Sequence, residues 1–171
     1  MRSRNAFVDV PEVRRRTMSA IRSKDTRPEI LVRRIAHALG YRFRLHRRDL
    51  PGRPDLVLPG RNKVVMVHGC FWHQHPDPTC RAAVKPKTRQ DYWYPKLEAN
   101  VARDIRTLEG LAALHWEVLV IWECELRDIL AVARRLIAFL GSPGGARSGN
   151  FQVPEGLAER LQPRRWTDRT G

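Results

Sequence analysis

The hydrophobic pattern of the chain predicts three helices. Thr26-Arg-Pro-Glu29 has the form of a helix-capping box, and apolar residues at intervals of three and four follow it as far as Gly40, which is placed to end a helix. The same spacing recurs over about residues 94–114 and again from 126 to 140. Each segment therefore predicts an amphipathic helix with one buried face.

Short runs rich in β-branched, leucine and aromatic residues predict strands between these helices. Pro59-Gly-Arg-Asn62 is a turn sequence between two of the runs, so those two are expected to form a hairpin. Together the elements predict an α/β fold, with a mixed central sheet flanked by helices. The runs are Tyr41–Leu45, Asp55–Leu58, Lys63–Val67 and Trp116–Trp122.

The chain length and the two chain ends set the expected domain organisation. A chain of 171 residues can bury one core but is too short for two full-sized domains. Residues 1–10 have little apolar pattern and are expected to be disordered, while a basic arm over residues 11–25 opens a single domain over 11–141. From residue 142 the composition turns to Gly, Ser, Pro and Arg, so 142–171 is expected to be a flexible tail.

The strong positive charge of the chain points to a polyanionic partner. Lys and Arg total 32 against 18 Asp and Glu, which gives a formal charge of +14. Such a charge attracts nucleic acid first and an anionic membrane surface second. No apolar run reaches the roughly 18 residues of a membrane helix, and the Arg-rich start lacks the apolar core of a signal peptide. We therefore expect a cytoplasmic, nucleoid-associated protein.

Three cysteines and a histidine suggest a metal site. Cys70, Cys80 and Cys124 cannot all pair within one chain, and an intracellular compartment keeps thiols reduced. With His75 they offer three thiolates and one imidazole, which is the closed ligand set of a structural zinc ion. The alternative is three buried thiols that act as small apolar groups. A zinc ion here would join the loop that contains His75 to the segment after the last strand.

One carboxylate and two histidines suggest hydrolytic chemistry. Asp55 follows Pro54 at the start of an apolar strand, where its carboxylate could bind a hard cation such as Mg²⁺. An aspartate in this place is by itself more often a turn cap. His68 and His73, just beyond the hairpin, titrate near neutral pH. Phosphodiester hydrolysis needs a metal to neutralise charge and a base to activate water, and these three residues would supply both.

The densest motifs resemble the very short patch repair (Vsr) endonucleases, a branch of the restriction-endonuclease-like fold. Leu50-Pro-Gly-Arg-Pro-Asp55 and Val67-His-Gly-Cys-Phe-Trp-His73 support the resemblance, which covers about residues 14–140. It implies a restriction-endonuclease-like core and an enzyme that nicks one DNA strand 5′ of the thymine in a T:G mismatch, which starts the repair of deaminated 5-methylcytosine. The similarity continues in Thr88-Arg-Gln-Asp-Tyr-Trp93, Asn100-Val-Ala-Arg-Asp104 and Trp122-Glu-Cys124.

The resemblance also implies roles for individual residues. Asp55 would hold the catalytic Mg²⁺ with the help of the backbone carbonyl of Val67. His73 would accept the proton of the attacking water, and His68 would contact the phosphate or a metal-bound water. The wider nuclease superfamily has Glu-x-Lys on the second strand, and its replacement by Val67-His68-Gly69 is expected within the Vsr branch.

Two assignments remain open at this point. Glu29 matches an acidic residue of the family and could support a metal-bound water, but its place in the capping box explains it equally well. The loop between His75 and Cys80 is longer than the spacing usual in the family. His73 and Asp77 are therefore rival zinc ligands.

Aromatic residues near the histidines suggest a DNA wedge. Phe71 and Trp72 follow a glycine in a His-rich loop, which is a poor place to bury hydrophobic groups and a suitable place to insert them between bases. A mismatched step is easier to open, which would make the wedge selective. The resemblance adds Trp93 to the wedge and places Met18 in the opposite groove. The alternative is that these aromatics belong to the core, above all Trp93, which lies between two tyrosines.

The expected partner is double-stranded DNA with a T:G mismatch. Other mismatch-repair proteins are partners by analogy with the family, and a monomer is expected because a nicking enzyme needs only one active site. Two alternatives are a restriction-like or general DNA nicking endonuclease without mismatch specificity and a zinc-stabilised DNA-binding module without catalysis. Phosphate contacts, with strong salt dependence, are expected from Arg14, Arg15, Arg16, Arg22, Lys24, Lys85, Lys87 and Arg89.

Overall fold

A three-stranded mixed sheet forms the centre of the protein. The computed structural model describes residues 24–143 and 152–161, so the predicted disorder of residues 1–10 and most of the basic arm, with Met18, lie outside the described part. The sheet has the order β1-β2-β3, with an antiparallel β1–β2 pair and a parallel β2–β3 pair. The elements are α2 (Arg27–Ala38), β1 (Leu56–Leu58), β2 (Lys63–His68), α3 (Gln90–Ala113), β3 (Glu117–Trp122), α4 (Ile129–Leu140) and α5 (Leu157–Leu161).

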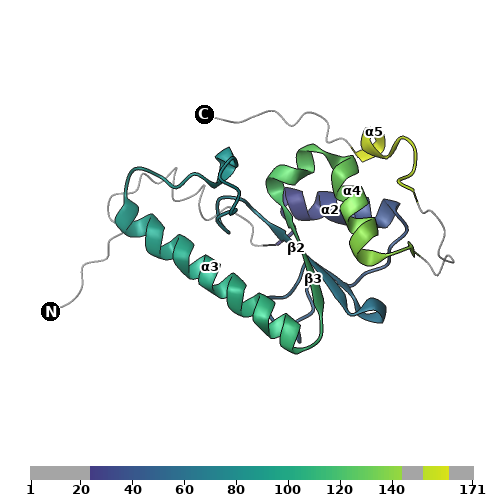
Figure 1. Ribbon diagram of the computed structural model, residues 1–171, viewed down its shortest axis with the longest axis horizontal. Coiled ribbons are helices and arrows are strands. Elements are labelled where there is room, and N and C mark those ends of the chain that lie inside the picture. The colour runs from purple at the N-terminus through teal and green to yellow at the C-terminus, as the bar shows by residue number, and fades with distance from the viewer. Residues whose placement is uncertain (1–23, 144–151, 162–171) are drawn as a thin grey trace.

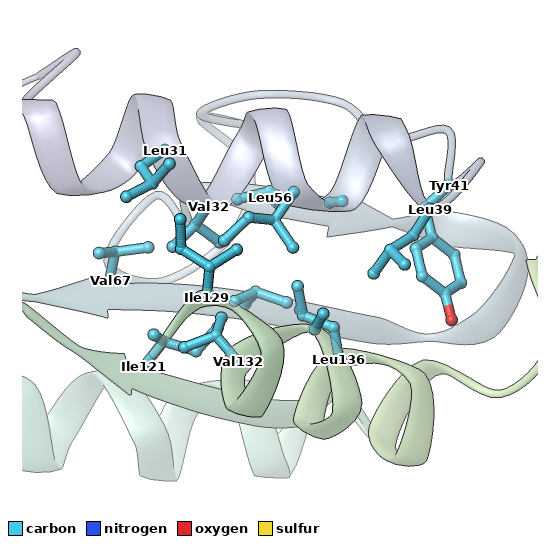
Figure 2. Packing of buried hydrophobic residues seen from close by; sticks show 14 of the residues in the cluster. Leu31, Val32, Leu39, Tyr41, Leu56, Val67, Ile121, Ile129, Val132 and Leu136 are labelled. Carbon is cyan, nitrogen blue, oxygen red and sulfur yellow. The ribbon is translucent and has the colours of Figure 1, made fainter. Parts of the chain in front are cut away.

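Helices cover both faces of this sheet, as the sequence predicts. The long helix α3 lies along one face, and α2 and α4 lie on the other (Figure 1). Because successive strand residues point to opposite faces, Val65 and Val67 of β2 enter the large core with α2 and α4 (Figure 2), while Val64 and Met66 enter a smaller core with α3. Both faces of β2 are therefore buried.

The start of α2 confirms the predicted helix cap. The Thr26 hydroxyl accepts the backbone N–H of Glu29 at 3.4 Å and donates to the Glu29 carboxylate at 2.8 Å. The carboxylate also accepts the backbone N–H of Asp25 at 2.9 Å, one residue earlier than in the standard capping box. Gly40, with φ +87°, follows the last turn. Glu29 is thereby fixed at the edge of the sheet.

Helix α3 begins earlier than the sequence pattern indicates. It runs for 24 residues from Gln90, whereas the apolar spacing predicts a start near residue 94. Trp93 and Asp104 therefore lie on one continuous helix. In the described ranges, no helix combines the length and the apolar character that crossing a membrane requires.

The predicted strand over Tyr41–Leu45 is not formed. One isolated antiparallel bridge joins Arg44 to Val57, and the rest of the segment is extended chain without a ladder. Tyr41 is buried and its hydroxyl donates to the carbonyl oxygen of Gly141 at 2.6 Å. The β-forming residues of this segment are therefore explained by packing on the core rather than by pairing in the sheet.

The expectation of a flexible tail over residues 142–171 is wrong for residues 152–161. Leu157 and Leu161 of α5 are buried in the core that α2 and α4 share with the sheet, and Val153 packs against it. Leu157 and Leu161 are four residues apart in α5, and so they share one face of that helix. The segment thus adds apolar surface to the core despite the polar composition around it.

Candidate functional site

Asp55 lies directly before β1 and faces β2. The backbone N–H of Val67 donates to Asp55 Oδ2 at 2.7 Å, which fixes the carboxylate near the end of β2. Burial is the main cause that raises the pKa of Asp55 to about 7; the nearby Glu29 carboxylate adds to the rise, while the Val67 N–H, Arg33 and His73 oppose it. The charges of Glu29 and His73 thus affect the pKa of Asp55. The contact with Val67 is through its N–H, and a role for its carbonyl stays a prediction.

His68 and His73 form a stacked pair at the end of β2. Their ring centroids are 4.0 Å apart and the ring planes differ by 10°. His68 is 4% exposed, and its Nε2 finds no hydrogen-bond partner among the residues that the structure describes. Burial, followed by the charge of His73, lowers the pKa of His68 to about 4. His68 is therefore neutral at neutral pH.

His73 is held by a residue that the sequence analysis did not assign. Its Nδ1 lies 2.6 Å from Oδ2 of Asp104, which α3 supplies. An ionised carboxylate only accepts, so Nδ1 donates to Asp104 and Nε2 is the ring nitrogen left to exchange a proton. The similarity over Asn100–Asp104 was the one signal for this residue, and nothing in the spacing showed that Asp104 would meet His73.

The ligand atoms of His68, His73 and Asp104 lie within 4.8 Å of one another, but their shape does not favour chelation. A metal binds an imidazole nitrogen in the plane of the ring. Because the two rings are nearly parallel and stacked, their planes do not meet within metal-bonding distance of both rings. The arrangement favours acid–base chemistry at His73 over a metal site on the histidine pair.

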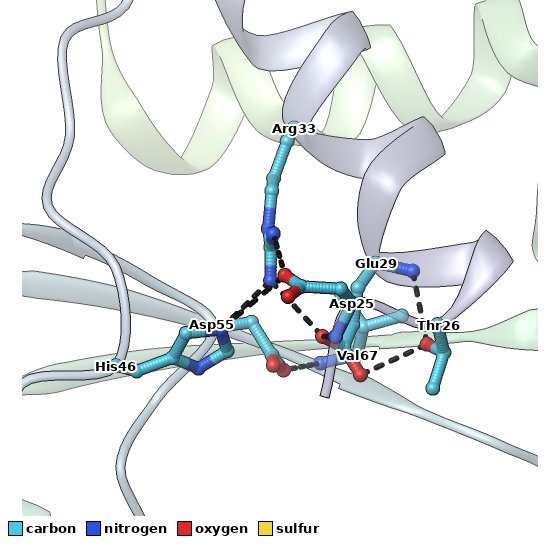
Figure 3. Close-up of polar contacts among 7 residues, drawn as sticks. All are labelled: Asp25, Thr26, Glu29, Arg33, His46, Asp55 and Val67. Carbon is cyan, nitrogen blue, oxygen red and sulfur yellow. Dashed lines mark hydrogen bonds and ion pairs between the residues drawn. The ribbon is translucent and has the colours of Figure 1, made fainter. Parts of the chain in front are cut away.

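The Glu29 carboxylate takes part in the helix cap and also lies near Asp55. It makes the capping contacts to Thr26 and Asp25, and it also stands beside Asp55 (Figure 3). Only 6% of Glu29 is exposed, and Arg33 Nη2 donates to its Oε2 at 3.0 Å. The cap thus fixes Glu29 next to Asp55 instead of turning it away.

The three cysteines and His75 come together in one cluster. One ligand atom from each of Cys70, His75, Cys80 and Cys124 lies within 4.8 Å of the others. Burial raises the pKa of Cys70 to about 12 and also raises that of Cys124, so these thiols would hold their protons without a cation beside them. A thiolate-binding ion such as zinc fits this donor set because it replaces those protons.

The two rival zinc ligands lie elsewhere. His73 is bonded to Asp104, and the Asp77 carboxylate accepts the backbone N–H and the hydroxyl of Thr79. Neither belongs to the cysteine cluster. The four donors that the sequence analysis placed first are therefore the four that the fold brings together.

Phe71, Trp72 and Trp93 form one half-buried aromatic cluster. The Phe71 ring lies 5.1 Å from the Trp72 ring and 5.4 Å from the Trp93 ring, and the ammonium of Lys96 lies 5.4 Å from the Trp72 ring. None of the three aromatic residues is fully buried. Each of them therefore keeps some exposed surface, and Lys96 lies beside it.

Comparison with known proteins places the chain in a family. The family model described as DNA mismatch endonuclease Vsr matches residues 8–79. The type II nicking enzyme V.XorIIP of Xanthomonas oryzae is 57% identical over 126 residues, which are 74% of this chain and 90% of that protein. The DNA mismatch endonuclease Vsr of Escherichia coli is 40% identical over 114 residues, which are 67% of this chain and 71% of that protein. This chain belongs to the Vsr family.

Membership of the Vsr family confirms the resemblance and the prediction of a DNA endonuclease. A further relative, the type II nicking enzyme V.NmeAIP of Neisseria meningitidis, is 39% identical over 119 residues, 70% of this chain and 83% of that protein. The family match includes Asp55, His68 and His73. Asp104 and Cys124 lie beyond it, and it is the fold that brings them to the site.

Proposed function

We propose that this Vsr-family endonuclease hydrolyses one strand of a DNA duplex 5′ of the thymine in a T:G mismatch, with Mg²⁺ as its catalytic metal. The observation that supports the chemistry most directly is the His73–Asp104 pair, with His73 and Glu29 both close enough to Asp55 to affect its pKa. The alignment with a mismatch endonuclease supports the choice of substrate. The reaction would start short patch repair of deaminated 5-methylcytosine.

The oxygen donors around Asp55 fit a hard cation. Asp55 would hold Mg²⁺ with the Val67 carbonyl, while the Glu29 carboxylate would orient water beside it. Bound there, the ion would supply charge neutralisation at the reacting phosphate. The pKa of Asp55, raised to about 7 by burial, agrees with a carboxylate whose charge is balanced by a cation in the working enzyme.

His73 is proposed as the proton acceptor. With its Nδ1 proton held by Asp104, its Nε2 would take the proton of the attacking water, and the Asp104 carboxylate would stabilise the cation that forms. His68 stays neutral and would donate a hydrogen bond to a phosphate oxygen, with no proton transferred. Acid–base work would thus fall to one histidine and contact with the phosphate to the other.

The cysteine cluster is proposed as a structural zinc site. Cys70, His75 and Cys80 belong to the loop after β2, and Cys124 follows β3. A zinc ion held by these four would join the loop that contains His73 to the sheet. It would have no open position for substrate and hence no part in the hydrolysis.

Double-stranded DNA would bind across the aromatic cluster. Phe71, Trp72 and Trp93 would insert at the mismatched step, with Met18 from the arm as the opposing element. The charge of +14 supports phosphate contacts. A monomer would suffice for a single nick, in the cytoplasm and beside other repair proteins.

Strand cleavage on end-labelled duplexes tests the proposal. The wild type should nick the thymine strand of a T:G duplex with Mg²⁺, and neither EDTA samples nor a fully paired duplex should be cut. Asp55→Ala should lose this activity by roughly a hundredfold or more. Asp49→Ala, at an exposed aspartate of the preceding loop, is the matched control and should cut normally. Equal cutting of both duplexes would favour a general nicking enzyme, and tight binding without cutting would favour a binding module.

A further inference from the structure

A group of side chains beside Glu29 and Asp55 has no part in the chemistry proposed above. At its centre is Arg33 of α2, one turn after Glu29, with a side chain that is 14% exposed. Its Nη1 donates to Asp25, and its Nη2 lies 3.0 Å from Glu29 Oε2 and 2.9 Å from His46 Nε2 (Figure 3). One guanidinium thus joins the segment before α2, the helix itself and the loop that leads to Asp55.

The hydrogen bond between Arg33 and His46 can have only one direction. A guanidinium has five N–H donors and no acceptor, so His46 Nε2 must accept in this contact. The guanidinium of Arg33 carries a positive charge and bonds to the carboxylates of Asp25 and Glu29.

Two acidic groups share the site that Arg33 borders. Glu29 is buried and Asp55 is half-buried, so the two carboxylates lie in a region with little access to solvent. Burying like charges together is costly unless a cation and hydrogen bonds balance them. Arg33 bonds to Glu29 directly, and its charge also favours ionised Asp55. Without Arg33, only the contacts to Thr26 and Asp25 would hold the Glu29 carboxylate, and no cation would balance its charge beside Asp55.

We propose that Arg33 is a positioning residue of the nuclease site, whose guanidinium, braced by Asp25 and His46, holds the Glu29 carboxylate beside Asp55. The inference rests on the proposed function, in which Glu29 and Asp55 serve the hydrolysis. A lysine would not serve equally, because one ammonium on a flexible chain cannot hold two carboxylates and an imidazole in a fixed fork. Arg33 acts through Glu29 and touches no reacting atom.

A double-mutant cycle tests this role, with single-turnover nicking measured at saturating enzyme and Mg²⁺. Arg33→Met should slow nicking about tenfold and change the half-saturating DNA concentration less than about twofold, since it alters the site and not the DNA contacts. In a Glu29→Gln background the same change should have almost no further effect, because the charge that Arg33 positions is gone. Arg34→Met, an exposed neighbour on the same helix, should match the wild type in both backgrounds.

Several results would overturn the inference. An equal loss in both backgrounds would mean that Arg33 acts independently of Glu29, and an Arg33→Met rate equal to that of Arg34→Met would mean that it does not act at all. If thermal unfolding shows that Arg33→Met does not fold, Arg33→Lys and His46→Asn replace it, with a partial loss expected in the wild-type background and none beside Glu29→Gln. A wild type that nicks no duplex overturns the proposed function and this inference with it, whereas an active wild type with an unaffected Arg33 variant overturns the inference alone.

Discussion

Asp55 illustrates at the scale of one residue how the burial of an ionisable carboxyl group lowers stability. Burial raises its pKa from 3.8 to about 7, so the metal-free folded chain holds a proton that the unfolded chain releases. The free energy of unfolding therefore falls as the pH rises from about 4 to about 7. Asp55→Asn keeps the shape and can still accept the Val67 N–H. We predict that it stabilises the protein in EDTA by about 1 to 4 kcal/mol at pH 8 and by little at pH 4.

Calorimetric unfolding of both proteins at the two pH values checks this prediction. Mg²⁺ should raise the melting temperature of the wild type at pH 8 but not that of Asp55→Asn, because a ligand stabilises the folded state that binds it. Asp49→Asn, at an exposed position, should change neither result. If Asp55→Asn were no more stable than the wild type at pH 8, the charge of Asp55 would not destabilise the metal-free chain.

Single residues also show what the sequence could and could not predict about the site. Asp55, His68 and His73 were predictable because they flank one hairpin, and the short chain between them keeps them close. Asp104 was not assigned, since it meets His73 only through the packing of α3 on the sheet. Arg33 was missed for the same reason, because its partners lie on three separate segments.

At the scale of elements, the loop before β1 and helix α3 fit together at one glycine. Gly52 has φ +68°, and a Cβ added there would lie 2.2 Å from Cγ2 of Thr107 on α3. The loop leads to Asp55, and Thr107 lies one turn from Asp104. We predict that Gly52→Ala destabilises the protein by about 2 to 4 kcal/mol, from backbone strain and overpacking. Nicking should also slow, because the loop and the helix can no longer hold Asp55 and Asp104, which have proposed roles in the reaction, in their correct relative positions.

Denaturant unfolding and nicking rates measure this effect against a matched glycine. Gly60 has no atom within 4 Å of an added Cβ and no strained φ, so Gly60→Ala should stay within about 0.5 kcal/mol of the wild type. Adding Thr107→Ala to Gly52→Ala should restore the part of the lost stability that comes from the clash with the Thr107 side chain. Equal denaturation midpoints for the two glycine variants would show that the close approach at Gly52 does not affect the stability of the protein.

Elements differ in how far local sequence determines them. The start of α2 was predictable because the cap contacts are made within a few residues. The segment Tyr41–Leu45 has strand-forming residues, yet pairing needs a partner, and β1 offers it a single bridge. α3 extends back to Gln90 through a polar turn that has little apolar periodicity.

At the scale of the whole molecule, the core extends beyond the segment that composition marks as folded. The layers and the mixed sheet followed from the order of helices and strands. The contribution of α5 did not, because a polar, Gly-rich average over residues 142–171 hides Leu157 and Leu161 of α5 and the preceding Val153. Judging a long segment by its composition therefore overlooked a short helix that packs against α2 and α4.

The cysteine cluster joins distant parts of the chain, and its metal can be tested through the whole fold. We predict that the purified protein contains one zinc ion and that Cys124→Ser loses most of it, with a melting temperature lower by roughly 10 °C. Asp77→Ala is the matched control, since Asp77 lies in the same loop but bonds to Thr79, and its zinc content should equal that of the wild type. Metal analysis together with thermal unfolding gives both readings. Loss of zinc in Asp77→Ala but not in Cys124→Ser would mean that the ion is held by the loop alone and does not fasten it to the sheet.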